Sequence, residues 1–201
     1  VLSFMEDYRQ TEWPELRVWL TSTTEQWATM AVSGPRARQL IAPLIDDISV
    51  EAEAMPHMSV QEGHIAGVPM RLFRMSFTRE MGYEINVPAR HGLHVWDALT
   101  KVGEGLGLTL YGTEASHVLR AEKGYIIVGL ETDGTVIPDD VGLGKMATMS
   151  KPDFLGMRSL VRPLAQEAGR KQLVALIPQD GRQIDEGAQI VVPADAGRSQ
   201  G

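Results

Sequence analysis

Glu84 is the residue whose type and position most suggest a binding role. It stands between Tyr83 and Ile85 in a stretch with the alternation of a β-strand. A carboxylate in such a strand must face solvent, a cation or a ligand, because burying an unpaired charge is costly. Periodicity alone favours the solvated face of a half-buried sheet, so at this level both interpretations stay open.

Three further features of the sequence have residue types that could carry chemistry. Asp139 and Asp140 are neighbouring carboxylates that could bind a metal ion or share a proton, although adjacent loop residues usually point apart. His91 and His94 have the i, i+3 spacing of two ligands on one helix face, but no third ligand is near, so we predict no metal site. Arg120, considered alone, is typical of a surface arginine on a helix.

Composition excludes several classes of function. The 201 residues are 43% hydrophobic and 22% charged, contain no Cys and have a net charge of −7. Thiol catalysis and Cys-ligated metals are therefore excluded, and the acidic balance argues against nucleic-acid or anionic-membrane surfaces. No apolar run approaches the ~18 residues of a membrane span, so we expect a cytoplasmic protein that handles a small molecule or a partner protein.

The elements that must position these residues follow from periodicity. Pro43 is expected to kink or end a helix that begins near Gly34-Pro35. A helix over 90–104 is predicted with Leu93, Trp96 and Leu99 facing inward. The other predicted elements are helices over 2–12, 114–123 and from Pro152 or Asp153 to 160, and strands over 16–20, 27–32, 58–65, 70–77, 82–87, 171–177 and 188–192.

The last two strands predict that the sequence is a piece of a longer chain. An isolated two-stranded unit is marginally stable at best, so residues 171–192 look like the opening of a sheet whose other strands lie elsewhere. The first residue, Val1, is also not a natural start.

Three segments carry a resemblance to a known family. They are 76–85 (SFTREMGYEI), 111–124 (YGTEASHVLRAEKG) and 135–144 (TVIPDDVGLG), the last followed by KPDFLG at 151–156. Their order and spacing resemble the aminomethyltransferase family, the T-proteins of glycine cleavage, from about Gln10 to Ile190. The strings QTEWP at 10–14, TEQWAT at 24–29 and LRAEKGYIIVG at 119–129 are most similar to one branch, the α subunits of heterotetrameric sarcosine oxidases.

The resemblance implies an α+β fold of the aminomethyltransferase type, built from lobes around a folate channel. Residues 1–14 would be the tail of the first folate-binding lobe. Residues 15–165 would form the folate-binding domain, with a ferredoxin-like middle lobe and the connection after it. Residues 166–201 would be the truncated start of a C-terminal β-barrel.

The resemblance also implies site residues. The family's Gly-aromatic-Glu motif, whose Glu binds the pterin of tetrahydrofolate, places that role on Glu84. Phe77, seven residues earlier, would line the pterin pocket, and Arg120 would contact the folate. A carboxylate suits the pterin because it accepts two adjacent N–H bonds side by side. Where this chain has Arg79, T-proteins usually have Gly.

The implied function is the folate-binding part of a sarcosine oxidase α subunit, which would form 5,10-methylenetetrahydrofolate from the oxidised substrate's one-carbon unit. FAD, FMN and NAD are expected elsewhere in a holoenzyme with other subunits. No catalytic residue is assigned in this chain, because the family's activating Asp lies in the first lobe, and the fragment alone is expected to be inactive. The alternatives are a T-protein aminomethyltransferase and a non-enzymatic module with a folate-binding-like fold.

Overall fold

The computed structural model describes residues 1–147, 151–185 and 187–190. The chain divides into two compact units, Val1–Tyr125 and Ile126–Gly201. The first contains the sheet, and the described part of the second consists of short helical turns joined by irregular segments. The predicted domain boundaries, after residues 14 and 165, stay predictions.

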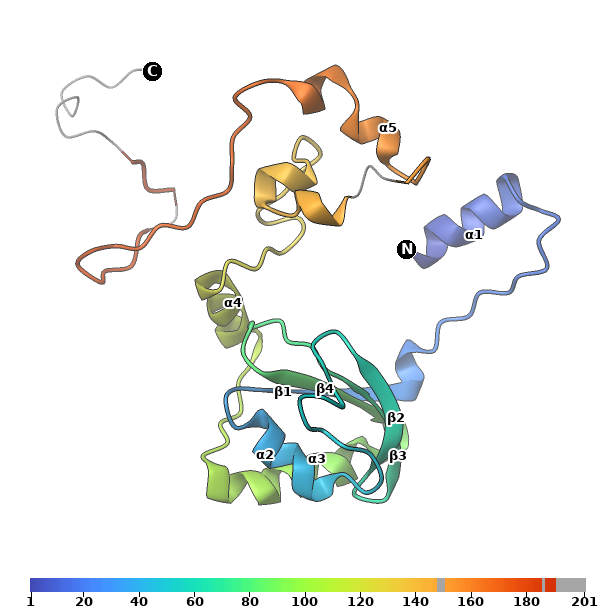
Figure 1. Cartoon of the computed structure of the whole chain (residues 1–201), viewed down its shortest axis with the longest axis vertical. Coiled ribbons are helices and arrows are strands. Elements are labelled where there is room, and N and C mark those ends of the chain that lie inside the picture. The colour runs from blue at the N-terminus through green and yellow to red at the C-terminus, as the bar shows by residue number, and fades with distance from the viewer. Residues whose placement is uncertain (148–150, 186, 191–201) are drawn as a thin grey trace. The chain divides into compact units, whose positions relative to one another are not determined.

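A four-stranded antiparallel sheet forms the centre of the first unit (Figure 1). Its strand order is β1-β4-β3-β2, with every neighbouring pair antiparallel. The mixture of this sheet with helices confirms the α+β class. The strands are β1 (Trp27–Ser33), β2 (Val60–Ile65), β3 (Val68–Phe73) and β4 (Gly82–Pro88).

Strict alternation in β4 gives the sheet one buried and one open face. Tyr83, Ile85 and Val87 are fully buried, whereas Glu84 and Asn86 are half-buried on the opposite face. This confirms the predicted alternation. In Figure 1 the helices α2 (Ala37–Ile41) and α3 (Gly92–Gly103) lie together on one side of the sheet, where they cover the buried face.

The buried face of α3 differs from the prediction. Val95 and Leu99 face the core, but Leu93 is 73% exposed and Trp96 is 42% exposed. The helix therefore buries an i, i+4, i+8 stripe ending at Gly103, whereas the prediction chose an i, i+3, i+6 set. The kink expected at Pro43 is confirmed, because α2 passes there into a 3₁₀ turn.

Two other expectations for this unit differ from the structure. Residues 16–20 form no strand, because no described strand lies beside them to complete a ladder. The described elements run strand, helix, three strands and helix, whereas a ferredoxin-like fold has a second helix between its third and fourth strands. A loop, residues 74–81, stands in that position, and it carries Phe77.

The remaining elements are short. The predicted strand at 171–177 is absent, and so is its partner as far as residue 190, while Val191 and Val192 lie outside the described residues. A two-stranded unit without further partners does not hold a ladder, which is the physical reason. The elements are α1 (Leu2–Thr11), α4 (Thr113–Glu122), α5 (Met157–Leu160) and the 3₁₀ turns Thr24–Gln26, Ala42–Leu44, Ala89–His91, Glu104–Leu106, Pro138–Val141, Gly144–Met146 and Pro163–Gln166.

Candidate functional site

Glu84 lies near the middle of the open face of the sheet. Its Cα pairs with Ala31 of β1 on one side and with Phe73 of β3 on the other. Residues paired in this way point to the same face, so the carboxylate projects between a methyl group and an aromatic ring. Val60 of β2 extends the same apolar row beyond Phe73.

The next row of this face consists of polar side chains that already have partners. The Thr29 hydroxyl donates to Oδ1 of Asn86 at 2.6 Å. Arg71 donates from Nε to Oε1 of Glu62 at 2.9 Å, and its guanidinium lies 4.7 Å from the centre of the Trp27 ring.

Glu84 is different from this row. Among the described residues its carboxylate has no hydrogen bond and no ion pair, although it is half-buried. The carboxylate oxygens of Glu84 are therefore open to a donor from solvent or from a ligand.

The 74–81 loop carries Phe77 and leads into β4. Gly82 begins β4 where a Cβ would lie 2.5 Å from Cβ of Ser76 and 2.8 Å from the oxygen of Met75, so only glycine permits this close approach. Thr78 is buried and bonded to Ser76 at 3.0 Å, which anchors the loop. Arg79 takes φ 58°, a left-handed conformation that favours glycine.

The same loop is tied to the end of α4, the helix that carries Arg120. Nζ of Lys123 lies 2.8 Å from Oε1 of Glu80, and Arg79 donates from Nη1 to the Lys123 oxygen at 3.4 Å. Arg120 is 7% exposed, and its Nη1 donates to the backbone oxygen of Tyr125 at 3.0 Å. Arg120 thus supports the turn that closes α4, in addition to any contact with a ligand.

A groove of about 970 Å³ runs along the outer edge of β1. Its walls are β1, the start of α2, the exposed side of α3, the 106–112 segment and the first turns of α4. Phe77 and Ala31 both line it, so the groove borders the face that carries Glu84. Its size lies within the usual range for small-molecule sites.

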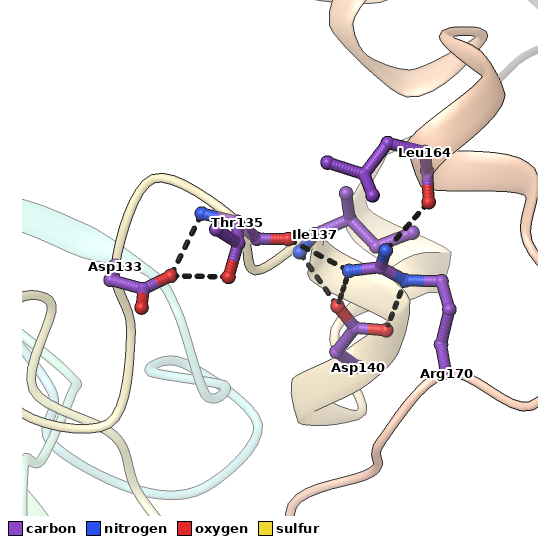
Figure 2. Close-up of polar contacts among 6 residues, drawn as sticks. All are labelled: Asp133, Thr135, Ile137, Asp140, Leu164 and Arg170. Carbon is purple, nitrogen blue, oxygen red and sulfur yellow. Dashed lines mark hydrogen bonds and ion pairs between the residues drawn. The ribbon is translucent and has the colours of Figure 1, made fainter.

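Asp140, one of the two neighbouring carboxylates at 139–140, has a structural role in the second unit. Asp140 is 6% exposed and forms a bidentate ion pair with Arg170, in which Nε donates to Oδ1 at 2.9 Å and Nη2 to Oδ2 (Figure 2). Arg170 also donates to the backbone oxygens of Leu164 and Thr135, at 2.7 and 2.8 Å. The N–H of Ile137 donates to Oδ2 of Asp140 at 2.9 Å.

The contacts of Asp140 with Arg170 and Ile137, here called the Asp140 clamp, control the ionisation of the Asp140 carboxylate. The hydrogen bonds from Arg170, and then the one from the Ile137 N–H, hold the pKa of Asp140 below its ordinary value of 3.8. Asp140 therefore stays ionised and is saturated by the chain itself. Asp139 is exposed and takes no part in the pair.

The candidate histidines do not form a metal site. His91 accepts a hydrogen bond from Nε of Arg90 at 3.0 Å, and Nε2 of His94 lies 3.0 Å from the backbone oxygen of Ala66. Within the described ranges, no group of three or more His, Cys, Asp or Glu side chains could hold a metal ion. In the same residues, no helix is long and apolar enough to cross a membrane.

Residues 1–151 match the model of the GCVT N-terminal domain. The chain belongs to this family. The sarcosine oxidase subunit alpha of Corynebacterium sp. (strain U-96) is 46% identical over the whole chain, and that of Rhizobium meliloti (strain 1021) is 40% identical over 91% of it. The aminomethyltransferase of Streptomyces coelicolor is 30% identical over 86% of the chain.

The chain spans only part of the length of each of these relatives. The chain spans about a fifth of the two sarcosine oxidase subunits, 21% and 18%, and 48% of the aminomethyltransferase. The predicted resemblance to the aminomethyltransferase family and its sarcosine oxidase branch is confirmed.

Within this GCVT domain the three predicted site residues lie on neighbouring elements. Glu84 is on β4, Phe77 is on the loop that leads into β4, and Arg120 is on the helix tied to that loop. Their roles toward a ligand stay predictions.

Sequence reasoning missed three groove residues, Arg36, Trp96 and His117. They come from separate elements that meet only in the folded unit. A usable signal was the helix face of Trp96, because Gly92 and Thr100, at i−4 and i+4, do not extend an apolar stripe through it. Arg170, the partner of Asp140, was missed because thirty residues separate the pair.

Proposed function

We propose that this chain is the tetrahydrofolate-binding part of a sarcosine oxidase α subunit. The observation that carries the proposal is Glu84, a half-buried carboxylate without described partners, set between Ala31 and Phe73 on the open face. The 40–46% identity to sarcosine oxidase α subunits supports this choice.

The residues present fit a pterin. A pterin ring shows two neighbouring N–H donors on one edge, and an ionised carboxylate accepts two such bonds in one plane. Phe73 beside Glu84, and Phe77 on the loop that leads into β4, offer apolar surface to a flat ring. Arg120 is proposed to act from α4, where its burial makes it a fixed positive charge near the loop that carries Phe77.

This chain's contribution would be binding and orientation. Glu84 would fix the plane of the pterin, and the tied 74–81 loop would hold Phe77 against it, so that the reacting end of the ligand has one position. The reduced folate, when bound, supplies the nucleophilic nitrogens that accept a one-carbon unit, and 5,10-methylenetetrahydrofolate is the proposed product.

The remaining chemistry would lie in other parts of a larger enzyme. We propose that FAD, FMN and NAD bind in those other parts and that the enzyme contains further subunits. We propose that the enzyme is cytoplasmic and that residues 1–201 alone have no activity. Oxidation of sarcosine by these residues without added subunits would contradict this assignment.

A second candidate is an aminomethyltransferase of glycine cleavage. It is favoured by the 30% identity to the aminomethyltransferase of Streptomyces coelicolor across most of the chain. Both candidates use the same folate site and differ in the one-carbon donor. Assays of the complete protein with sarcosine, and with an aminomethyl carrier protein, separate them.

The test of the folate site is Glu84→Gln. The amide replaces one acceptor oxygen with a donor that faces a donor, so affinity for tetrahydrofolate should fall roughly 10–100-fold, the loss of one charge-assisted hydrogen bond. Calorimetric titration of the complete protein measures it.

Glu62→Gln is the matched control. Glu62 lies on the same face but is exposed and paired with Arg71, so its variant should bind folate within about twofold of the parent. Equal affinities of the Glu84 variant and the parent would remove the proposed site.

A further inference from the structure

Arg74 stands at the point where the backbone of β3 leaves its neighbour β4. The described pairing between these two strands ends with Phe73 opposite Glu84. The backbone of Arg74 bonds instead to the residues that precede β2. Its N–H donates to the oxygen of Ser59 at 2.8 Å, and its oxygen accepts from the N–H of Met58 at 2.9 Å. Glu84 is therefore the last residue of β4, toward the start of that strand, that β3 supports through its backbone.

The side chain of Arg74 takes over where this backbone pairing stops. Its Nη1 donates to the backbone oxygen of Gly82 at 3.0 Å, and its Cζ lies 5.1 Å from the centre of the Tyr83 ring. Gly82 and Tyr83 are the two residues that precede Glu84. A hydrogen bond from a charged donor is stronger than one between neutral groups, so this contact is a suitable substitute for the missing strand pairing.

The ring on which the guanidinium lies is itself fixed. Tyr83 is fully buried, its hydroxyl donates to the oxygen of Val50 at 3.3 Å, and the same hydroxyl accepts from Nε of Arg38 at 3.2 Å. Arg74 is half-buried, and no Asp or Glu of the described residues forms an ion pair with it. A cation over the face of a buried ring is an attractive arrangement, so Arg74 has one well-defined position.

Arg74 and the Glu84 carboxylate lie on opposite faces of the sheet. Neighbouring residues of a strand point to opposite faces. Phe73 therefore lies beside Glu84 on the open face, whereas Arg74 lies beside Tyr83 on the buried face. An effect of Arg74 on a ligand of the open face must consequently pass through the position of the strand.

We propose that Arg74 is a positioning residue of the folate site and acts through Glu84. The inference rests on the proposed function. Without the guanidinium, β1 is the only described strand that pairs with the start of β4, and the Glu84 carboxylate takes up a wider range of orientations. A pair of hydrogen bonds to a flat ring depends steeply on angle and distance, so this freedom lowers affinity for the pterin.

The test measures the affinity of the complete protein for tetrahydrofolate by calorimetry. Arg74→Gln removes the charge and the planar guanidinium and should weaken binding about five- to tenfold, the loss of one charge-assisted hydrogen bond. Arg74→Lys keeps the charge and should recover part of this loss. Circular dichroism checks that each variant is folded, and if Arg74→Gln is not, Arg74→Lys carries the comparison with an expected loss of about threefold. A folded Arg74→Gln variant, or in its absence a folded Arg74→Lys variant, with the affinity of the parent would overturn this inference.

A double variant separates positioning from general stabilisation. If Arg74 acts through Glu84, then Arg74→Gln should weaken tetrahydrofolate by less than about twofold in a protein that already carries Glu84→Gln, because the two changes remove the same interaction. A merely structural role would weaken binding by the same factor in both backgrounds, and that result would contradict the proposal.

Arg38→Gln is the matched control. Arg38 is also a half-buried arginine in contact with Tyr83, but its described bonds go to the Tyr83 hydroxyl and the Val50 oxygen, and none goes to Gly82. Its variant should bind tetrahydrofolate within about twofold of the parent. Equal weakening by the two arginine variants would overturn this inference alone. Absence of tetrahydrofolate binding to the wild type would overturn the proposed function and, with it, this inference.

Discussion

Glu84 and Asp140 are two carboxylates that the chain treats in opposite ways. Asp140 is buried and saturated by the Arg170 guanidinium and the Ile137 N–H. Glu84 is half-buried on a rigid strand and has no described partner. The acceptor oxygens of Asp140 are therefore taken by the chain itself, whereas those of Glu84 are not.

The comparison shows that proximity in sequence was a poor guide to chemistry. Asp139 and Asp140 are neighbours in sequence, but only Asp140 is buried, and its partner is thirty residues away. Periodicity alone favours a solvated carboxylate at Glu84, and the fold adds Phe73 and Ala31 as its neighbours on the same face.

Removing the partner of Asp140 should have the largest structural effect. In Arg170→Gln the buried carboxylate loses its cation, and the Thr135 and Leu164 oxygens lose their donor. Amide exchange between residues 135 and 173 should accelerate about tenfold or more, because the clamp holds these segments together. Exchange measured by mass spectrometry checks this, with Arg182→Gln as the exposed control.

A double variant sharpens the same point. If the two side chains act as one unit, Asp140→Asn combined with Arg170→Gln should cost much less than the sum of the single changes. Strict additivity would mean that the ion pair does not carry the stability of this segment.

The second largest effect is expected from acid, which should break the ion pair of Asp140 with Arg170. The pKa of Asp140 is lowered in the folded unit, so its contribution to stability is complete above the ordinary value of 3.8 and is lost as pH falls through the lowered folded value. Exchange in residues 135–173 should therefore accelerate below about pH 4, and Asp140→Asn should lack this component. A parent and variant with the same acid profile would exclude Asp140 as the cause.

The smallest effect is expected at Glu84, and its sign is opposite. Glu84→Val should stabilise the sheet by about 0.5–1 kcal/mol, because it replaces an unpartnered carboxylate with a residue that suits a half-buried central strand. The same change should abolish folate binding. Chemical denaturation and calorimetry measure the two effects.

Asn86→Val on the same strand is the matched opposite. Oδ1 of Asn86 accepts a hydrogen bond from the Thr29 hydroxyl, so the replacement of Asn86 should lower the free energy of unfolding by about 1 kcal/mol. If Glu84→Val also destabilises, Glu84 has a structural contact and the contrast with Asp140 fails.

The sequence by itself determined the local features of this protein. Alternation in 82–87 was enough to place Tyr83, Ile85 and Val87 in the core, and the motifs around Glu84 and Arg120 were enough to identify the family. Such features succeed because they depend on residues near in the chain, whose periodicity a strand or helix imposes.

Tertiary structure alone decided the partners. It placed Trp96 on the exposed side of α3 and paired Asp140 with Arg170. It also left the segment at 171–177 without a described strand to pair with. It also brought three residues to one groove: Arg36, which precedes α2, Trp96 of α3 and His117 of α4. These outcomes depend on long-range packing and on which hydrogen-bonding groups are already taken, and neither is encoded in any local pattern.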